Sequence, residues 1–144
     1  MVDKTTRLVA EIDLDAVMEL SVADRAYIAG YFDGEGSVGL YPKKSGFALK
    51  VTIAQRKPEV LLWMHSLFGG AFVSIDRVER NNQYYELRLE GPALALPLLR
   101  IVAPYVREKK EQVTVVIEHY TNIGDKTLED KNNVVSLLKE LKRA

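Results

Sequence analysis

The chain has 144 residues, 47% of them hydrophobic, which suits one compact domain with its own core. The 20 basic residues balance the 20 acidic ones, and a formal net charge of zero counts against a strongly basic nucleic-acid binder. The absence of cysteine excludes disulfides and thiolate zinc sites, and two histidines, His65 and His119, are too few for a histidine-rich metal site.

The charge is unevenly distributed along the chain. Residues 1–24 contain two basic and six acidic residues, a net charge of −4, so the remainder carries +4. We therefore divide the chain into an acidic N-terminal extension, 1–20, and a single mildly basic domain, 21–144. No apolar run approaches the roughly 18 residues that span a membrane, and no signal pattern begins the chain. We expect an intracellular protein, in an organelle, the cytoplasm or the nucleoid.

The first elements surround a short glycine-rich stretch. The apolar residues of 1–20 suggest a short strand or helix that packs on the body. Ser21-Val22-Ala23-Asp24 forms a capping-box pattern, which predicts a helix from there to about Asp33. Its small pair, Ala29-Gly30, would let another backbone approach closely. Gly34 and Gly36 are expected to end this helix.

Two strand pairs and four further helices follow. Residues alternate between apolar and polar at 37–43 and 47–54, around a Lys44-Ser45-Gly46 turn, which predicts a β-hairpin. Pro58 opens a helix that runs to about Phe68. A second strand pair is expected at 72–76 and 84–90, around a turn at Arg80-Asn81-Asn82. Helices are expected at 92–103, 107–122 and 127–142; the last, with Leu128, Val134, Val135, Leu138 and Leu141, would be an amphipathic cover.

This order predicts an α+β fold: an antiparallel four-stranded sheet with helices packed on one face. The other face would be polar and mixed in sign, which is compatible either with an ordinary solvated surface or with ligand binding. The side chains assigned to it are Tyr41, Lys43, Lys50, Thr52, Ser74, Asp76, Tyr84, Glu86 and Arg88.

The segment Ile28-Ala29-Gly30-Tyr31-Phe32-Asp33-Gly34-Glu35-Gly36 resembles the LAGLIDADG motif of homing endonucleases. It has the small pair, two large apolar residues, and the acid-Gly-acid-Gly ending in register, followed by Ser37-Val38-Gly39, which is similar to the family's first strand. The resemblance extends through an αββαββα order over about 21–122. The alternative for the segment is a glycine-rich helix stop with solvated acids.

The resemblance implies a specific assembly. Two motif helices pack side by side in this family, and a chain with one motif is therefore expected to form a saddle-shaped homodimer with two-fold symmetry. Ala29, Gly30, Phe32 and Asp33 are the expected interface residues. The polar faces would enter the major groove of double-stranded DNA, where the nine residues above contact bases and phosphates, and symmetry implies a long near-palindromic target.

The family also implies an active site at the end of the motif helix. Glu35 occupies the metal-ligand position, where the family usually has Asp, and the Gly34 carbonyl matches a backbone ligand. The expected ion is Mg²⁺, with Mn²⁺ as another possible ion. Two Glu35 carboxylates near the dyad would repel each other unless cations neutralised them. Asp33 would support the helix end by hydrogen bonding.

Gln55 and Lys109 complete the expected catalytic set. Gln55 matches the family's polar residue that positions water, and Lys109 matches a basic residue near the scissile phosphate. Lys110 is the alternative to Lys109, and Arg56 or Lys57 would replace a second basic residue. The competing interpretations are a strand-end cap for Gln55 and a solvated helix start for the two lysines.

The leading hypothesis is a Mg²⁺-dependent, site-specific double-strand DNA endonuclease of a mobile intron or intein. The alternative is a cleavage-inactive DNA-binding protein, or a maturase that binds intron RNA, on the same scaffold. A purely structural dimerisation module would need no carboxylate at position 35.

Overall fold

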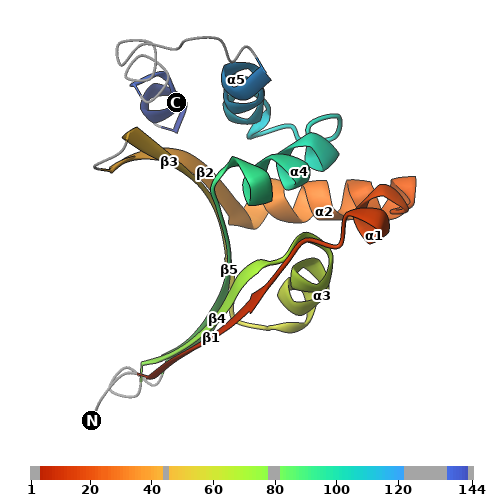
Figure 1. Ribbon diagram of the computed structural model, residues 1–144, viewed down its shortest axis with the longest axis vertical. Coiled ribbons are helices and arrows are strands. Elements are labelled where there is room, and N and C mark those ends of the chain that lie inside the picture. The colour runs from red at the N-terminus through yellow and green to blue at the C-terminus, as the bar shows by residue number, and fades with distance from the viewer. Residues whose placement is uncertain (1–3, 44–45, 78–81, 122–135, 143–144) are drawn as a thin grey trace.

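The computed structural model describes residues 4–43, 46–77, 82–121 and 136–142. A curved antiparallel sheet forms one layer, and helices α1 to α4 cover its convex side (Figure 1). The elements, in chain order, are β1 (Lys4–Ala10), α1 (Leu14–Met18), α2 (Val22–Glu35), β2 (Gly36–Lys43), β3 (Gly46–Gln55), α3 (Glu59–Phe68), β4 (Gly70–Arg77), β5 (Asn82–Glu90), α4 (Pro92–Val102) and α5 (Lys110–Thr121).

The strand order across the sheet is β1-β4-β5-β3-β2. The α+β class and the two predicted hairpins are confirmed, but the described residues form five strands, one more than predicted. The extra strand is β1, which pairs with β4 from Lys4–Asp76 to Ala10–Gly70. The first 20 residues thus contain both elements that the sequence left open, a strand and then the short helix α1.

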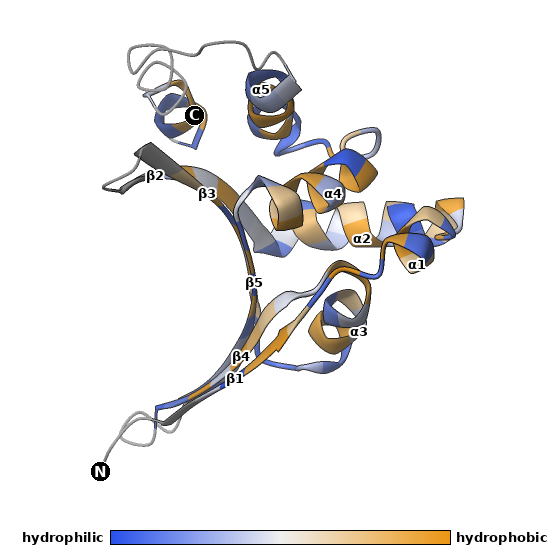
Figure 2. Cartoon of the chain, viewed as in Figure 1, coloured by the Kyte–Doolittle hydropathy of each residue, from blue (hydrophilic) through white to orange (hydrophobic). Residues whose placement is uncertain are grey.

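The core lies between the convex face of the sheet and the helices. One row of paired residues, Leu8–Phe72–Leu87–Ile53, crosses four strands on this face, and its last three members are buried. Helix α2 contributes Ile28 and Phe32, both fully buried. Figure 2 shows that the hydrophobic residues of the helices face the sheet and each other. Burying aliphatic and aromatic surface here supplies the main stabilisation of the fold.

Helix α2 begins as predicted. The Ser21 hydroxyl accepts a hydrogen bond from the Asp24 N–H at 3.0 Å. The helix continues through Gly34 to Glu35, and Gly36 alone forms its C-cap, in an extended conformation. A Cβ atom at Gly36 would lie 2.3 Å from the buried Phe32 ring. Packing against Phe32, and not a left-handed turn, therefore requires glycine at this position.

The C-terminal part agrees with the prediction where it is described. Helix α5 begins at Lys110, three residues later than expected, because the backbone N–H groups of residues 107–109 donate hydrogen bonds to the Asp33 carboxylate. Residues 136–142 are helical, with Leu138 buried in the core, while the rest of the predicted 127–142 helix lies outside the described residues. Within the described part, none of the helices is long and apolar enough to cross a membrane.

Candidate functional site: the concave face and the end of α2

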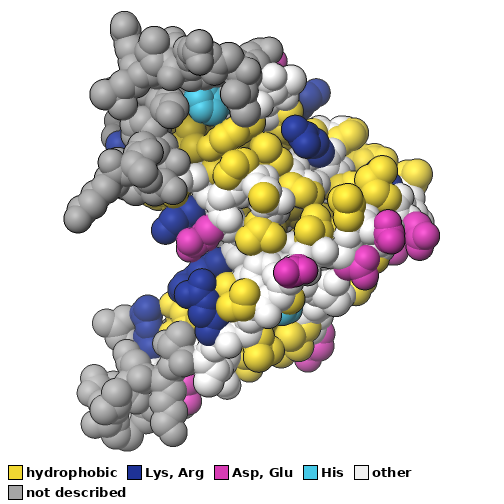
Figure 3. All heavy atoms as spheres, in the orientation of Figure 1, with side chains coloured by type: hydrophobic (Ala, Val, Ile, Leu, Met, Phe, Trp, Pro, Cys, Tyr) yellow, Lys and Arg dark blue, Asp and Glu magenta, His cyan; other side chains and the backbone are white. Residues whose placement is uncertain are grey.

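The concave face of the sheet is set by the strand register. Directly paired residues point to the same side of an antiparallel sheet. One row crosses all five strands as Val9–Ala71–Arg88–Thr52–Ser37, and its neighbour runs Arg7–Val73–Glu86–Ala54. These rows have the opposite parity to the buried Phe72 and Leu87, so they face away from the helices. Figure 3 shows Lys and Arg side chains gathered in the hollow of this side.

Most of the predicted face residues lie on this side. Six of the nine have the parity of the concave rows; Lys43 shares their backbone register, although its side chain lies outside the described residues. The six are Tyr41, Lys50, Thr52, Tyr84, Glu86 and Arg88.

Ser74 and Asp76 require a correction. They pair with Tyr85 and Gln83, and Tyr85 stacks on Phe72 with ring centroids 5.6 Å apart on the helix side. Both residues therefore lie on the opposite face from Tyr84. The sequence did not reveal this because the apolar and polar faces of β4 are reversed relative to the core: the apolar Ala71, Val73 and Ile75 form a small buried cluster on the concave side, while Ser74 and Asp76 share the helix side with Phe72. The same register adds Arg7 and Arg77, which the sequence reasoning missed.

Several charges of the concave face interact with each other. An Arg88 guanidinium nitrogen lies 3.1 Å from Glu86 Oε1, so the carboxylate expected to read a base already has a partner. Lys50 Nζ lies 3.8 Å from Glu90 Oε1. Because both side chains are exposed, this ion pair contributes little to stability. Arg77 donates to the Tyr84 hydroxyl at 3.0 Å and lies over its ring. Within the described residues, Arg7 and Arg77 make no ion pair.

Asp33 joins the end of α2 to the approach to α5. Its Oδ2 accepts from the backbone N–H groups of Arg107 and Glu108 at 2.8 and 3.0 Å, and its Oδ1 from that of Lys109 at 2.8 Å. Burial acts to raise the pKa of this carboxyl, but the three N–H donors and the nearby Lys109 charge together hold the pKa below its usual value. Asp33 therefore has a hydrogen-bonding role, as expected, but its side chain bonds to the residues that precede α5 and not to the end of its own helix.

The predicted catalytic residues lie around this junction. The Lys109 ammonium donates to the Asp33 carbonyl, which holds Lys109 beside the last turn of α2. Gly36 pairs with Ile53, so Glu35 and the end of β3 at Gln55 lie at the same end of the hairpin. Gln55 Oε1 accepts from the Arg56 N–H at 3.1 Å, the strand-end cap considered above. Arg56 and Lys57 are exposed in the following bend.

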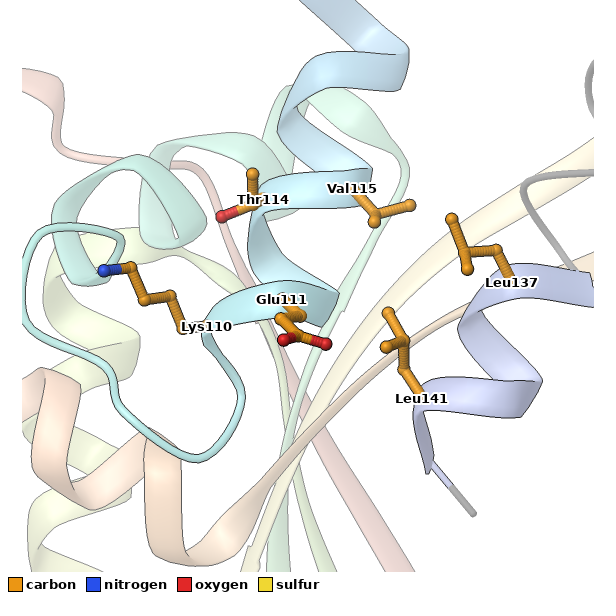
Figure 4. Close-up of a pocket in the computed structure, with 6 residues that line it drawn as sticks. All are labelled: Lys110, Glu111, Thr114, Val115, Leu137 and Leu141. Carbon is orange, nitrogen blue, oxygen red and sulfur yellow. The ribbon is translucent and has the colours of Figure 1, made fainter. Parts of the chain in front are cut away.

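Lys110 differs from Lys109 in its surroundings. It is exposed at the start of α5 and borders a largely apolar pocket of about 470 Å³ between α5 and residues 136–142. In Figure 4, Val115 on α5 faces Leu137 and Leu141 across this pocket. Lys109 instead borders a more polar hollow of about 420 Å³, together with Ser37. The geometry thus favours Lys109 over Lys110 as the lysine at the motif end.

The same polar hollow contains a second lysine, from the C-terminal helix. Lys142 borders it, and its ammonium lies 6.0 Å from the centroid of the Tyr41 ring, which Lys50 approaches to 5.6 Å. Burial lowers the pKa of Lys142. The hollow therefore joins β2 to the start of α5, and its charged lining consists of Lys109, Lys142 and Glu108.

Glu35 and Gly34 offer oxygen atoms that suit a hard divalent cation. The Glu35 side chain is exposed and makes no hydrogen bond or ion pair within the described residues. The C-terminal end of a helix carries partial negative charge on its carbonyls, which also favours a cation. However, the described part holds no cluster of three or more His, Asp or Glu side chains that is placed to hold a metal ion. One chain therefore offers only part of the roughly six-ligand shell that Mg²⁺ requires.

The outer side of α2 is an exposed stripe of small residues. Gly30 and Gly34 are exposed, and a Cβ atom at either would meet nothing within 4 Å. We call this surface the α2 stripe; it consists of the exposed small residues Ala23, Ala26, Gly30 and Gly34, with the exposed Tyr27 beside them.

Of the four residues predicted at the dimer interface, one lies in the α2 stripe. Gly30 belongs to it, but Ala29 and Phe32 are 1% and 0% exposed in the chain's own core, and Asp33 binds the approach to α5. These three side chains are therefore not free to meet a second helix. The 3.6-residue period explains the correction, since positions 29 and 32 fall on the side of α2 that covers the sheet.

Comparison with known proteins identifies the family. The family described as the LAGLIDADG-like domain matches residues 23–95, about half of the chain, from the start of α2 into α4. The protein belongs to this family. A search of curated proteins found no significant match.

Solved structures show the same fold. The homing endonuclease I-CvuI, crystallised with the I-CreI target in the presence of Mg with the DNA not cleaved, superposes with a TM-score of 0.56 at 17% identity, over 85% of this chain and 96% of that one. The group I intron-encoded homing endonuclease I-CeuI, complexed with DNA, gives 0.63 at 16% identity, over 88% of this chain and 69% of that one. At these identities the likeness establishes the fold alone.

Proposed function

We propose that the protein is a site-specific endonuclease that hydrolyses both strands of duplex DNA at a long near-palindromic target, the activity of an intron or intein mobility enzyme. The observation that carries the proposal is the junction at the end of α2. There the exposed Glu35 carboxylate and the Gly34 backbone follow directly on Asp33, whose carbonyl accepts a hydrogen bond from the Lys109 ammonium. A carboxylate that could bind a metal ion and an ammonium that could bind a phosphate thus lie at one end of α2, next to the polar sheet face.

The active form of the proposal is a homodimer. The α2 stripe is exposed, and a Cβ atom at Gly30 or Gly34 would meet nothing within 4 Å. Aromatic rings flank it: the ring centroids of Tyr27 and Trp63 are 6.2 Å apart. Small residues let two helix backbones approach closely, and a two-fold axis along the stripe would place the two Glu35 residues near each other. The second chain would then add its own Glu35 and Gly34 oxygens to those that one chain offers to a divalent cation.

The concave faces of the dimer would bind the duplex. Six predicted face residues remain on this side, and Arg77 joins them. The Arg88–Glu86 pair presents guanidinium N–H donors whose orientation Glu86 fixes, and these donors suit guanine edges or phosphates. Lys109 would offset charge that develops on the scissile phosphate. The bound ions would supply activation of a water and stabilisation of the leaving oxygen.

A selection experiment tests this function. Purified protein is incubated with Mg²⁺ and a library of near-palindromic duplexes, and both cut ends and retained duplexes are sequenced. Recurrent cuts in both strands at one symmetric site are the expected result. Retention of one sequence without cutting would replace the proposal with a cleavage-inactive DNA-binding protein. If no duplex is cut or retained, the same selection with structured intron RNA tests the maturase alternative.

A further inference from the structure

Strand β1 widens the concave face beyond the two hairpins. It pairs with β4 along seven residues, and Arg7 stands directly opposite Val73. Val73 in turn pairs with Glu86, which lies on the concave side beside its partner Arg88. Arg7 therefore belongs to the concave face, on the sheet edge farthest from β2. One added strand widens a sheet by about 4.8 Å.

The surroundings of Arg7 leave its charge available. The side chain is exposed, and within the described residues it makes no ion pair. Its neighbour Val73 is fully buried although it lies on the concave side, so the side chains of the flanking strands must cover it. A long aliphatic stem with a charged end suits that position, because the stem can cover an apolar residue while the guanidinium stays in solvent.

The N-terminal extension is acidic overall, but strand β1 within it is basic. Lys4 and Arg7 are its only charged residues, and the acids of the extension that follow, such as Glu11 and Asp13, come after the strand has ended. The extension therefore combines a basic strand in the sheet with an acidic segment outside it.

We propose that β1 is part of the nucleic-acid surface and that Arg7 binds a phosphate of the DNA backbone that the β2–β3 and β4–β5 hairpins do not reach. The inference rests on the proposed DNA-binding function and adds a contact that no part of the matched region, residues 23–95, contains. Because Arg7 binds a phosphate, it strengthens binding without choosing among base pairs.

The test uses the duplex that the wild-type protein selects from the near-palindromic library, in Ca²⁺ without Mg²⁺. Arg7→Gln removes the charge but keeps much of the aliphatic stem over Val73, and Arg7→Lys keeps the charge. Arg100→Gln is the matched control, since Arg100 is an exposed arginine on α4, on the convex side. The measurements are the dependence of affinity on salt and the phosphates whose ethylation blocks binding.

For Arg7→Gln, we expect the slope of log affinity against log salt to become shallower by about one per protomer, with one interfering phosphate lost in each half-site. Arg7→Lys should keep the wild-type slope, and so should Arg100→Gln. If Arg7→Gln keeps both the slope and the interfering phosphates, the inference is wrong while the proposed function stands. If wild-type protein selects no duplex, the proposed function fails first, and the inference with it.

Discussion

The Lys109 ammonium donates a hydrogen bond to the carbonyl of Asp33, while the Asp33 carboxylate accepts one from the Lys109 backbone N–H at 2.8 Å. The two residues are 76 positions apart, and this double link holds the approach to α5 against the last turn of α2. Two more N–H groups, from Arg107 and Glu108, bind the same carboxylate. A site residue from the C-terminal half of the chain is thus positioned by the motif itself.

Replacing Asp33 by Asn should therefore destabilise the protein in a pH-dependent way. The change removes a charged acceptor from three N–H groups, and we expect a loss of about 1–2 kcal/mol at neutral pH because the site is partly exposed. The folded state holds the pKa of Asp33 below its usual value, so this stabilisation is present above the ordinary Asp pKa of about 3.9 and is lost as pH falls through the lower folded value.

Urea unfolding of wild type and Asp33→Asn between neutral and strongly acidic pH measures this effect. The two free energies of unfolding should differ at neutral pH and converge in acid. Asp76→Asn is the control, because the Asp76 carboxylate makes no hydrogen bond or ion pair within the described residues. A constant difference between wild type and Asp33→Asn at every pH would show that the carboxylate charge does not contribute.

Replacing Glu35 by Gln should separate cleavage from binding. The amide keeps the shape of the side chain but loses the charge that would hold a divalent ion, while the polar sheet face is untouched. We expect the rate of cleavage of the selected duplex to fall by more than about 100-fold. Loss of a residue that only supports a metal ligand costs up to about 100-fold, and loss of a ligand itself should cost more. DNA affinity in Ca²⁺ should change little by comparison. Glu19→Gln, at an exposed position after α1, should cut normally; wild-type cutting by Glu35→Gln would refute the metal site.

The sequence predicted the elements well because their signals are local. The Ser21 cap, the alternation in 47–54 and the helix ends at Gly36 and Gly69 each depend on neighbouring residues, and the structure confirms them, although α2 continues through Gly34, where an end was also expected. Two site predictions failed where the answer depends on register between distant segments. Ser74 was assigned to the wrong face because the apolar residues of β4, Val73 and Ile75, lie on the concave side, and only the pairing of Ser74 with Tyr85 shows this.

The remaining differences have the same origin. Strand β1 is short and precedes acidic residues, and its pairing partner β4 lies some 60 residues further on, so no local pattern identified it as a sheet strand. Ala29 and Phe32 resembled interface residues because the motif contains them. Only the packing of α2 on the sheet shows that they are buried and that Gly30 and Gly34 are exposed.

The glycines of the motif consequently differ in what they require. Gly36→Ala should destabilise the fold, because the new Cβ would lie 2.3 Å from the Phe32 ring and 2.8 Å from the Phe32 carbonyl. Phe32 is fully buried and has no room to withdraw, so we expect a loss of about 1–3 kcal/mol, the usual range for overpacking. Thermal and urea unfolding measure it. Ser37→Ala, one residue further on and exposed, is the control and should change stability by less than about 0.5 kcal/mol.

Gly30→Leu should have the opposite outcome: an intact monomer that no longer dimerises. The position is exposed, with open space where a Cβ would stand, and leucine favours a helix over glycine by up to about 1 kcal/mol, so the fold of one chain should tolerate it. A second α2 helix packed against the stripe would meet the new side chain, since only small residues allow close backbone approach.

Sedimentation equilibrium over a range of concentrations distinguishes these effects. Wild type should be dimeric and Gly30→Leu monomeric, with unfolding of the variant no easier than that of the dissociated wild type. Arg100→Leu, which adds the same side chain at an exposed position of α4, should leave the dimer intact. Loss of the dimer should also abolish double-strand cleavage, because each chain supplies only one Glu35. A monomeric wild type would contradict the proposed homodimer, and an unchanged Gly30→Leu dimer would place the two-fold contact elsewhere.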